Sequence, residues 1–349
     1  MAKHIHEKAE PDHIPASVNP HLKARKRKER SASYYIDGIL SGDRVILSQA
    51  ITLIESNRKQ DQLKARSIVE ACLPHSGRSF RLGITGVPGV GKSTFIETFG
   101  LQLLQKEHQL AVLTIDPSSQ LTKGSILGDK TRMAQLSTHD KVFIRPSPAG
   151  DSLGGVAAKT REAVLLCEAA GYDFILIETV GVGQSEVAVY QLTDFFLLLL
   201  LPGAGDELQG IKRGVVEMAD MIAVNKADHD RVLSAQKARA AYQRALHLYP
   251  PKSSGWTAQA LTCSALQNEG ISEIIDQLGL FLQRTKGNGH FLKNRQDQAV
   301  HWFRQQLQQR ILDNFLSSDT QQKQLKKLEA AIIAGEVSPQ AGVERFLSS

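Results

Sequence analysis

The segment GVPGVGKS, Gly86 to Ser93, has the residue types and the spacing that bind nucleotide phosphates. It matches G-x-x-x-x-G-K-[ST], follows the apolar run RLGIT and opens the helical stretch TFIETFGLQLL, which is the context in which this motif forms a phosphate loop. Glycines let backbone N–H groups surround the phosphates, and a helix N-terminus adds partial positive charge. We expect Lys92 to reach the β- and γ-phosphates and the Ser93 hydroxyl to coordinate Mg²⁺. The expected phosphate-binding residues are Gly86, Val87, Pro88, Gly89, Val90, Gly91, Lys92, Ser93 and Thr94.

A second motif, Asn225-Lys226-Ala227-Asp228, follows the apolar run MIAV and is typical of a guanine site. Its aspartate accepts hydrogen bonds from N1–H and N2–H₂ of guanine, whereas adenine offers no matching pair of donors, and such sites discriminate by up to about 10⁴–10⁵. The segment Ser264-Ala265-Leu266 follows another apolar run, at a place where backbone N–H groups commonly meet guanine O6. Four residues alone could be a strand end and a turn. Two such segments in this order after a phosphate loop indicate GTP rather than ATP.

The segment LIETVGVGQSE, residues 176–186, lies between these motifs. Nucleotide switches usually end such a strand with Asp-x-x-Gly, and here the acid is Glu178, with Gly181 three residues later. We interpret Glu178 as the acid of a variant switch that reaches Mg²⁺ through a water, and Gly181 as the hinge that responds to the γ-phosphate. Val182 follows Gly181 in place of the glutamine that orients water in Ras-like proteins, and Gln184 comes two residues late. We therefore expect slow intrinsic hydrolysis that a partner accelerates.

Two further acids belong to the same region. Asp116 ends the run LTID, and Asp129 lies in GSILGDKTRM. Asp116 could instead be an N-cap before Ser118, and Asp129 could be a solvated loop charge. We favour metal-organising roles for both, because both are expected on the side of the sheet that carries the phosphate loop.

These motifs need strands that end at one edge of a sheet. Seven short apolar runs alternate with turns and helical stretches, and their continuous rather than alternating character indicates strands that are buried on both faces of a parallel sheet. We predict a doubly wound α/β fold of the P-loop GTPase type, with ligands at the carboxyl ends of the strands. The runs span residues 81–85, 110–115, 141–145, 173–177, 195–201, 221–224 and 260–263.

Helical patterns flank this core. Residues 34–70 carry an apolar face, and residues 297–316 place Val300, Phe303, Leu307, Ile311 and Phe315 on one stripe of a helix. The stripe could pack on the core, or it could be buried against a second subunit. We predict four segments: a basic tail (1–30), an N-terminal helical extension (31–80), a GTPase domain (81–286) and a C-terminal helical arm (287–349).

Composition excludes several classes of protein. The net charge of +6 is concentrated in residues 1–30, which hold eight Lys or Arg against four acids, so the rest is close to neutral. We interpret the tail as a solvated arm rather than a nucleic-acid site. The three cysteines are single and widely spaced, which fits a reducing cytosol and predicts neither a disulfide framework nor a structural metal. The longest strongly apolar run has seven residues, and a membrane span needs about 20. A secretory or transit signal is not expected.

The runs DPSS…GSILGDKTRM, RPSP…LGGVA, ETVGVGQSE, PGAGDELQGIKRG and EMADMIAVNKAD resemble the MeaB/ArgK family of P-loop GTPases over roughly residues 35–349. The resemblance implies a GTPase chaperone that gates adenosylcobalamin loading onto methylmalonyl-CoA mutase, or a related mutase, and protects it. It also implies a homodimer held by C-terminal helices. It assigns phosphate and metal to Lys92 and Ser93, and the organisation of the metal to Asp116, Asp129 and Glu178. Lys212, in GDELQGIKRG, would face phosphate from a third switch, although a solvated charge is an equal alternative.

Two functions remain as alternatives. A metallochaperone GTPase would depend on Cys/His clusters, and the N-terminal histidines are loosely spaced with no cysteine near them. A transport-associated kinase or ATPase conflicts with the guanine motif. The segment QLTKG departs from the Arg-Thr-Gly-Gly pattern expected after DPSS, so contacts by residues 121–123 stay open. We expect a cytoplasmic protein that uses GTP/GDP and Mg²⁺, with neither nucleic acid nor membrane as partner.

Overall fold

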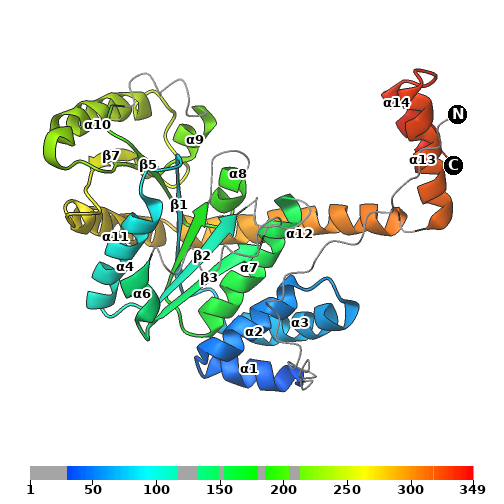
Figure 1. Cartoon of the computed structure of the whole chain (residues 1–349), viewed down its shortest axis with the longest axis horizontal. Coiled ribbons are helices and arrows are strands. Elements are labelled where there is room, and N and C mark those ends of the chain that lie inside the picture. The colour runs from blue at the N-terminus through cyan, green and yellow to red at the C-terminus, as the bar shows by residue number, and fades with distance from the viewer. Residues whose placement is uncertain are drawn as a thin grey trace, which may run out of the picture.

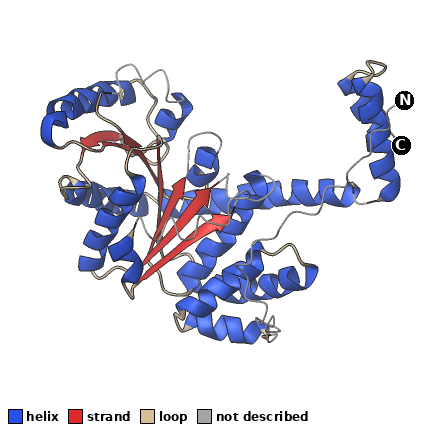
Figure 2. Ribbon diagram, in the orientation of Figure 1, coloured by secondary structure: helices blue, strands red, loops and turns tan. Residues whose placement is uncertain are grey.

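The computed structural model describes residues 30–116, 133–148, 153–179, 185–203, 213–316 and 318–348. Within these ranges seven strands form one parallel sheet in the order β3-β2-β4-β1-β5-β6-β7. Figure 2 shows strands in red and the surrounding helices in blue. Each predicted apolar run forms one of these strands, so the predicted fold class is confirmed. The strands are β1 (Phe80–Gly86), β2 (Leu110–Asp116), β3 (Val142–Pro148), β4 (Phe174–Thr179), β5 (Phe195–Leu200), β6 (Met221–Val224) and β7 (Gln259–Thr262).

The strand β1 lies at the centre, between β4 and β5. After β1 the chain forms β2, β3 and β4 on one side of it, with β4 inserted between β1 and β2, and it then crosses to the other side to form β5, β6 and β7. The carboxyl end of β1 is therefore the point where the strand order reverses. Open α/β sheets bind ligands at this point, because the loops on its two sides diverge and leave a crevice.

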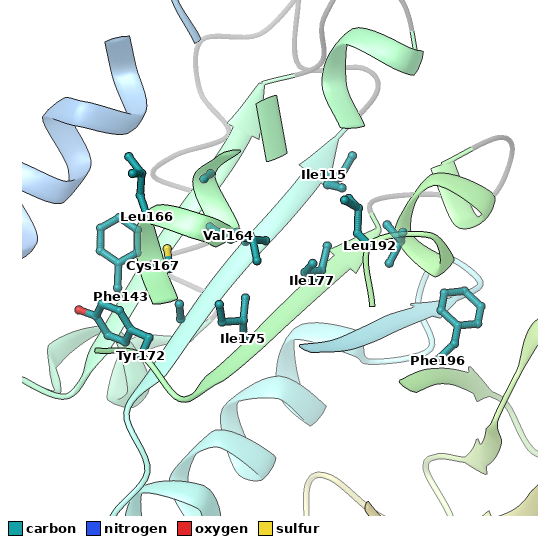
Figure 3. Close-up of a cluster of buried hydrophobic side chains, with 14 of the residues drawn as sticks. Ile115, Phe143, Val164, Leu166, Cys167, Tyr172, Ile175, Ile177, Leu192 and Phe196 are labelled. Atoms are coloured by element: carbon teal, nitrogen blue, oxygen red, sulfur yellow. The ribbon is translucent and has the colours of Figure 1, made fainter. Parts of the chain in front are cut away.

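Two layers of helices cover the sheet. Side chains alternate between the faces of a strand, and along β4 Phe174 and Leu176 join one buried cluster while Ile175 and Ile177 join the other. The first cluster lies under α4 (Lys92–Gln105), α6 (Ala134–Thr138) and α11 (Ile271–Gly287). The second lies under α7 (Leu153–Ala169), α8 (Ser185–Tyr190), α9 (Arg213–Met218) and α10 (Val232–Leu246). Figure 3 shows part of this second cluster, in which Val164 and Cys167 of α7 face Ile175 and Ile177.

The N-terminal part is helical, as predicted, but it is divided into three helices. These are α1 (Ala32–Leu40), α2 (Arg44–Glu55) and α3 (Lys59–Cys72), and the short 3₁₀ turn η1 (Leu73–His75) follows them. Asp43 begins α2 by accepting hydrogen bonds from the amides of Val45 and Ile46 at 2.8 and 3.0 Å, which is typical of an N-cap. The three helices pack together beside α7 (Figure 1).

The C-terminal part is formed by α12 (His290–Phe315), α13 (Asp319–Ile333) and α14 (Pro339–Leu347). The first half of α12 packs on the core through the buried side chains Phe291 and Trp302. Its second half extends away from the sheet and carries α13 and α14 at its far end (Figure 1). The predicted stripe residues Val300, Phe303 and Ile311 are 49%, 64% and 60% exposed. No helix in the described ranges combines the length and the apolar character that crossing a membrane requires.

Candidate nucleotide-binding site

The phosphate loop joins β1 to α4 at the reversal point of the sheet. Three glycines of the loop, Gly86, Gly89 and Gly91, have positive φ. Gly86 has φ 155°, and a Cβ there would lie 2.5 Å from the carbonyl oxygen of Leu199 in β5. Gly91 has φ 91° and is the N-cap of α4, where no side chain caps the helix. The helix N-terminus therefore faces the loop with its own amides, which is the arrangement that binds anions.

Lys92 places its ammonium group over this loop. Its Nζ donates hydrogen bonds to the carbonyl oxygens of Gly86 and Val87 at 2.8 and 3.5 Å. Burial lowers the pKa of Lys92 below its ordinary value, and the negative charges of Glu178 and Glu186 oppose that lowering. The ammonium thus lies where it can meet phosphate oxygens that enter the loop.

Two carboxylates are buried at the same edge of the sheet. Glu178 belongs to β4 and is 4% exposed, and in the strand register it lies opposite Ile84 of β1 and Thr114 of β2. Glu186 lies in the first turn of α8 and is 2% exposed. Glu178 was predicted as a site residue. Glu186 was not, although it ends the segment ETVGVGQSE, and the signal that could have found it is an acid in the first turn of a helix that follows the switch motif.

The two guanine motifs meet in the structure. Asp228 is buried at 4% exposure, and its Oδ2 accepts a hydrogen bond from Ser264 Oγ at 2.8 Å. Its Oδ1 lies 3.7 Å from the guanidinium of Arg231. Lys226 adopts φ 60°, and its Cε lies 3.7 Å from the position of a Cβ on Gly91. The loops after β6 and β7 therefore form one site beside the phosphate loop.

Asn225 connects the guanine motifs to the phosphate loop. Its Nδ2 donates to the carbonyl oxygen of Val90 at 2.8 Å, and its Oδ1 accepts from the amide of Ala265 at 3.1 Å. The side chain is 1% exposed, so both bonds are shielded from water. One amide group thus holds the phosphate loop and the loop 264–266 at a fixed separation.

The helix α4 supplies a second connection that the sequence motifs did not predict. Thr98 Oγ1 donates to the carbonyl oxygen of Ala265 at 2.7 Å, and Gln102 Nε2 donates to Asn268 Oδ1 at 2.6 Å. Both residues are half-buried, and no local sequence pattern distinguishes them from other polar residues of the helix. Only the packing of α4 against the loop after β7 brings them together.

The predicted site residues divide into those that the structure describes and those that it does not. The structure places Lys92, Ser93, Glu178, Asn225 and Asp228 around one edge of the sheet, and the side chain of Leu266 is 76% exposed. Asp116 ends β2 at that edge, and its side chain lies outside the described part of the chain. Three residues lie wholly outside it: Asp129, Gly181 and Lys212. The roles of all these residues stay predictions.

The chemistry of the described side chains fits a magnesium ion. A serine hydroxyl in the first turn of α4 and a buried carboxylate at the end of β4 are oxygen donors, which Mg²⁺ prefers. Mg²⁺ usually takes one or two carboxylates and completes its octahedron with water and phosphate oxygens. Within the described ranges no group of three or more His, Cys, Asp or Glu side chains could hold a metal. The fit therefore concerns an ion that nucleotide oxygens help to hold.

These features define the fold and site of a P-loop GTPase. A phosphate loop lies at the reversal point of a parallel sheet, and Asn225 connects it to the loop 264–266, where Ser264 binds the buried carboxylate of Asp228. The chain belongs to the MeaB family, whose model, described as methylmalonyl Co-A mutase-associated GTPase MeaB, matches residues 47–320. The predicted family and GTPase activity are thereby confirmed.

Individual relatives match over most of the chain. GTPase ArgK of Escherichia coli is 41% identical over 318 residues, which cover 91% of this chain and 96% of the relative. The mitochondrial methylmalonic aciduria type A homolog of Mus musculus is 40% identical over 347 residues, which cover 96% of this chain and 84% of the relative. A crystal structure described as an LAO/AO transport system kinase superimposes with a TM-score of 0.74 at 35% identity, covering 91% of this chain and 96% of that chain.

Proposed function

We propose that this GTPase is a chaperone that gates adenosylcobalamin loading onto methylmalonyl-CoA mutase, or a related acyl-CoA mutase, and protects that enzyme. The observation that carries the proposal is the match of residues 47–320 to the mutase-associated GTPase family. The relatedness to a methylmalonic aciduria type A homolog supports the same client. GTP binding and hydrolysis would then control the access of the cofactor to the mutase.

Each part of the site has a proposed role in hydrolysis. Lys92 binds the β- and γ-phosphate oxygens, and backbone N–H groups of the segment from Gly86 to Thr94, other than Pro88, surround them. Ser93 and Glu178, with Asp116 and Asp129, hold Mg²⁺ and its waters; the ion, when bound, neutralises charge that develops on the phosphate oxygens. Gly181 is the hinge that responds to the γ-phosphate, and Lys212 faces phosphate from a third switch. On the base side, Asp228 accepts the guanine donors, and backbone N–H groups of residues 264–266 meet O6.

We propose that intrinsic GTP hydrolysis is slow and that a partner protein accelerates it. The segment after Glu178 has no glutamine directly after Gly181 to orient the attacking water. We expect the isolated protein to hydrolyse GTP well below about one turnover per second, as a P-loop GTPase does without its activator. Stopped-flow detection of phosphate release checks this expectation, and turnover of tens per second by the isolated chain would contradict it.

We further propose a homodimer in the cytoplasm. The stripe on the outer half of α12 supports the dimer, because it exposes several large apolar side chains on one helix face. The three cysteines are free and buried, which suits a reducing compartment.

Affinity capture tests the chaperone function. The tagged full-length protein is loaded with GDP or with a non-hydrolysable GTP analogue, and co-purifying proteins are identified by mass spectrometry. We expect an adenosylcobalamin-dependent mutase, with recovery that differs between the two nucleotides. The matched control is Lys92→Ala, which should reduce this nucleotide dependence. Recovery of no cobalamin enzyme under either condition would refute the proposal.

A further inference from the structure

Two threonine hydroxyls meet in the interior between the phosphate loop and Glu178. Thr85 Oγ1 and Thr179 Oγ1 are 2.8 Å apart, and both residues are completely buried at 0% exposure. Thr85 directly precedes Gly86, the first residue of the phosphate loop, and Thr179 directly follows Glu178. The hydrogen bond therefore joins the two strands at the last residues before their functional loops.

The backbone pairing of these strands stops one residue earlier. The register between β1 and β4 runs from Phe80 opposite Phe174 to Ile84 opposite Glu178. Past that pair, Gly86 turns away into the phosphate loop. The hydroxyl bond thus extends the cross-strand connection by one residue, at the place where the two backbones separate.

Packing does not require hydroxyl groups at these positions. On the face of the sheet that carries these threonines the neighbours are apolar, because Leu198 of β5 lies opposite Thr85 and Ile115 of β2 lies opposite Thr179, and both are buried. Valine has nearly the shape of threonine and would fill the same space. A buried hydroxyl is costly unless it is hydrogen-bonded, so two hydroxyls at this depth stabilise the fold little more than two valines would.

We propose that Thr85 and Thr179 are positioning residues for GTP hydrolysis. Their hydrogen bond holds the end of β4 against the base of the phosphate loop, and so fixes Glu178 relative to the phosphates that Lys92 and the loop bind. The inference rests on the proposed role of Glu178 in organising the metal. Loss of alignment by about 1 Å at a reacting centre costs on the order of 100-fold in rate. A missing hydroxyl bond that allows a smaller shift should therefore lower kcat by about ten-fold.

Valine substitutions separate positioning from stability. Thr85→Val or Thr179→Val alone leaves the other hydroxyl buried without its partner, so each single variant should lower the melting temperature. The double variant Thr85→Val/Thr179→Val removes both polar groups and should restore much of that loss. Single-turnover GTP hydrolysis by the full chain should remain about ten-fold slower in the double variant, while its GDP affinity stays within about two-fold of wild type.

Two further comparisons control the experiment. Thr179→Ser retains a hydroxyl and should recover most of the lost rate. Thr285→Val removes a hydroxyl that is equally buried, with 0% exposure, and that donates to the carbonyl oxygen of Phe281 in α11 at 2.8 Å, away from the site. It should lower the melting temperature without changing kcat.

Three outcomes would overturn the inference. In the first, the double variant hydrolyses GTP at the wild-type rate, and the pair is then a structural contact only. In the second, a folded double variant loses GDP affinity in proportion to its rate. In the third, which decides the matter if the valine pair does not fold, Thr179→Ser loses as much rate as Thr179→Val. A wild-type protein that failed to hydrolyse GTP at all would instead refute the proposed roles of the site residues.

Discussion

The residue that we propose to recognise guanine is a buried carboxylate. Asp228 is almost completely shielded from solvent, and Ser264 holds one of its oxygens in place. A shielded acceptor interacts strongly with a matching donor, and it is costly to leave unpaired. In the proposed site, the preference for guanine would follow from the chemistry of this one side chain, whose direction Ser264 fixes.

Asp228→Asn should raise the dissociation constant for GDP by roughly 100-fold, because the carboxamide sets an N–H₂ group against the guanine donors. Isothermal titration calorimetry measures the change. Xanthosine diphosphate is the matched ligand control, since its 2-oxo group can accept a hydrogen bond from the new amide. Unchanged GDP affinity would show that Asp228 does not contact the base.

Glu178→Ala should reduce Mg²⁺-dependent GTP hydrolysis more than it reduces GDP binding. The carboxylate is expected to act on the metal and its waters, whereas the phosphate loop and the base site retain their contacts with GDP. Hydrolysis is followed as a function of Mg²⁺ concentration, and GDP affinity is measured on the same preparation. Equal losses in the two measurements would contradict the assignment.

At the level of the elements, a buried charge network fastens α12 to the amino edge of the sheet. Arg295 of α12 binds Asp194, which precedes β5, through two hydrogen bonds of 2.9 and 2.7 Å, and it also donates to the carbonyl oxygen of Gly77. Arg81 at the start of β1 binds Glu168 of α7 through two bonds of 2.9 Å. The network holds four elements, and removing one partner would leave a buried charge uncompensated.

Arg295→Met should lower the free energy of unfolding by about 3–5 kcal/mol, because the carboxylate of Asp194, whose side chain is only 1% exposed, would lose the charged partner that donates two hydrogen bonds to it. Urea denaturation followed by circular dichroism measures the change. Lys293→Met, at an exposed position of the same helix, is the control and should change stability by less than about 0.5 kcal/mol. Equal effects of the two substitutions would show that the network does not hold the helix.

At the scale of the whole molecule, the outer half of α12 exposes apolar side chains to solvent. The outer half of α12 extends beyond the sheet, and Phe303, Leu307 and Ile311 are between 46% and 64% exposed. Apolar side chains in one row on a protruding helix commonly mark an interface. In the proposed dimer this surface would be buried against a second subunit.

Phe303→Glu combined with Ile311→Glu should convert the proposed dimer into monomers, because each substitution places a charge inside the apolar contact. Sedimentation equilibrium gives the mass in solution. Gln305→Glu adds the same charge two residues away, on a different side of the helix, and should leave the dimer intact. A wild-type protein that sediments as a monomer at every concentration would refute the dimer itself.

The sequence by itself determined the strands, the phosphate loop and the guanine motif. All three depend on local chemistry: apolar runs that must be buried on both faces, a glycine that permits positive φ at Gly91, and a carboxylate, Asp228, whose acceptors are expected to match the donors of guanine. Such motifs can be recognised without knowledge of the fold, because neighbouring residues in the chain meet each of these requirements.

Only the tertiary structure decided which of these segments meet. The order of the strands places Asn225 between Val90 and Ala265, sets Thr98 against the loop after β7, and brings Thr85 to Thr179 across 94 residues of chain. It also decided that the stripe of α12 is exposed rather than buried. Contacts between distant residues depend on how whole elements pack, and no pattern within a short segment contains that information.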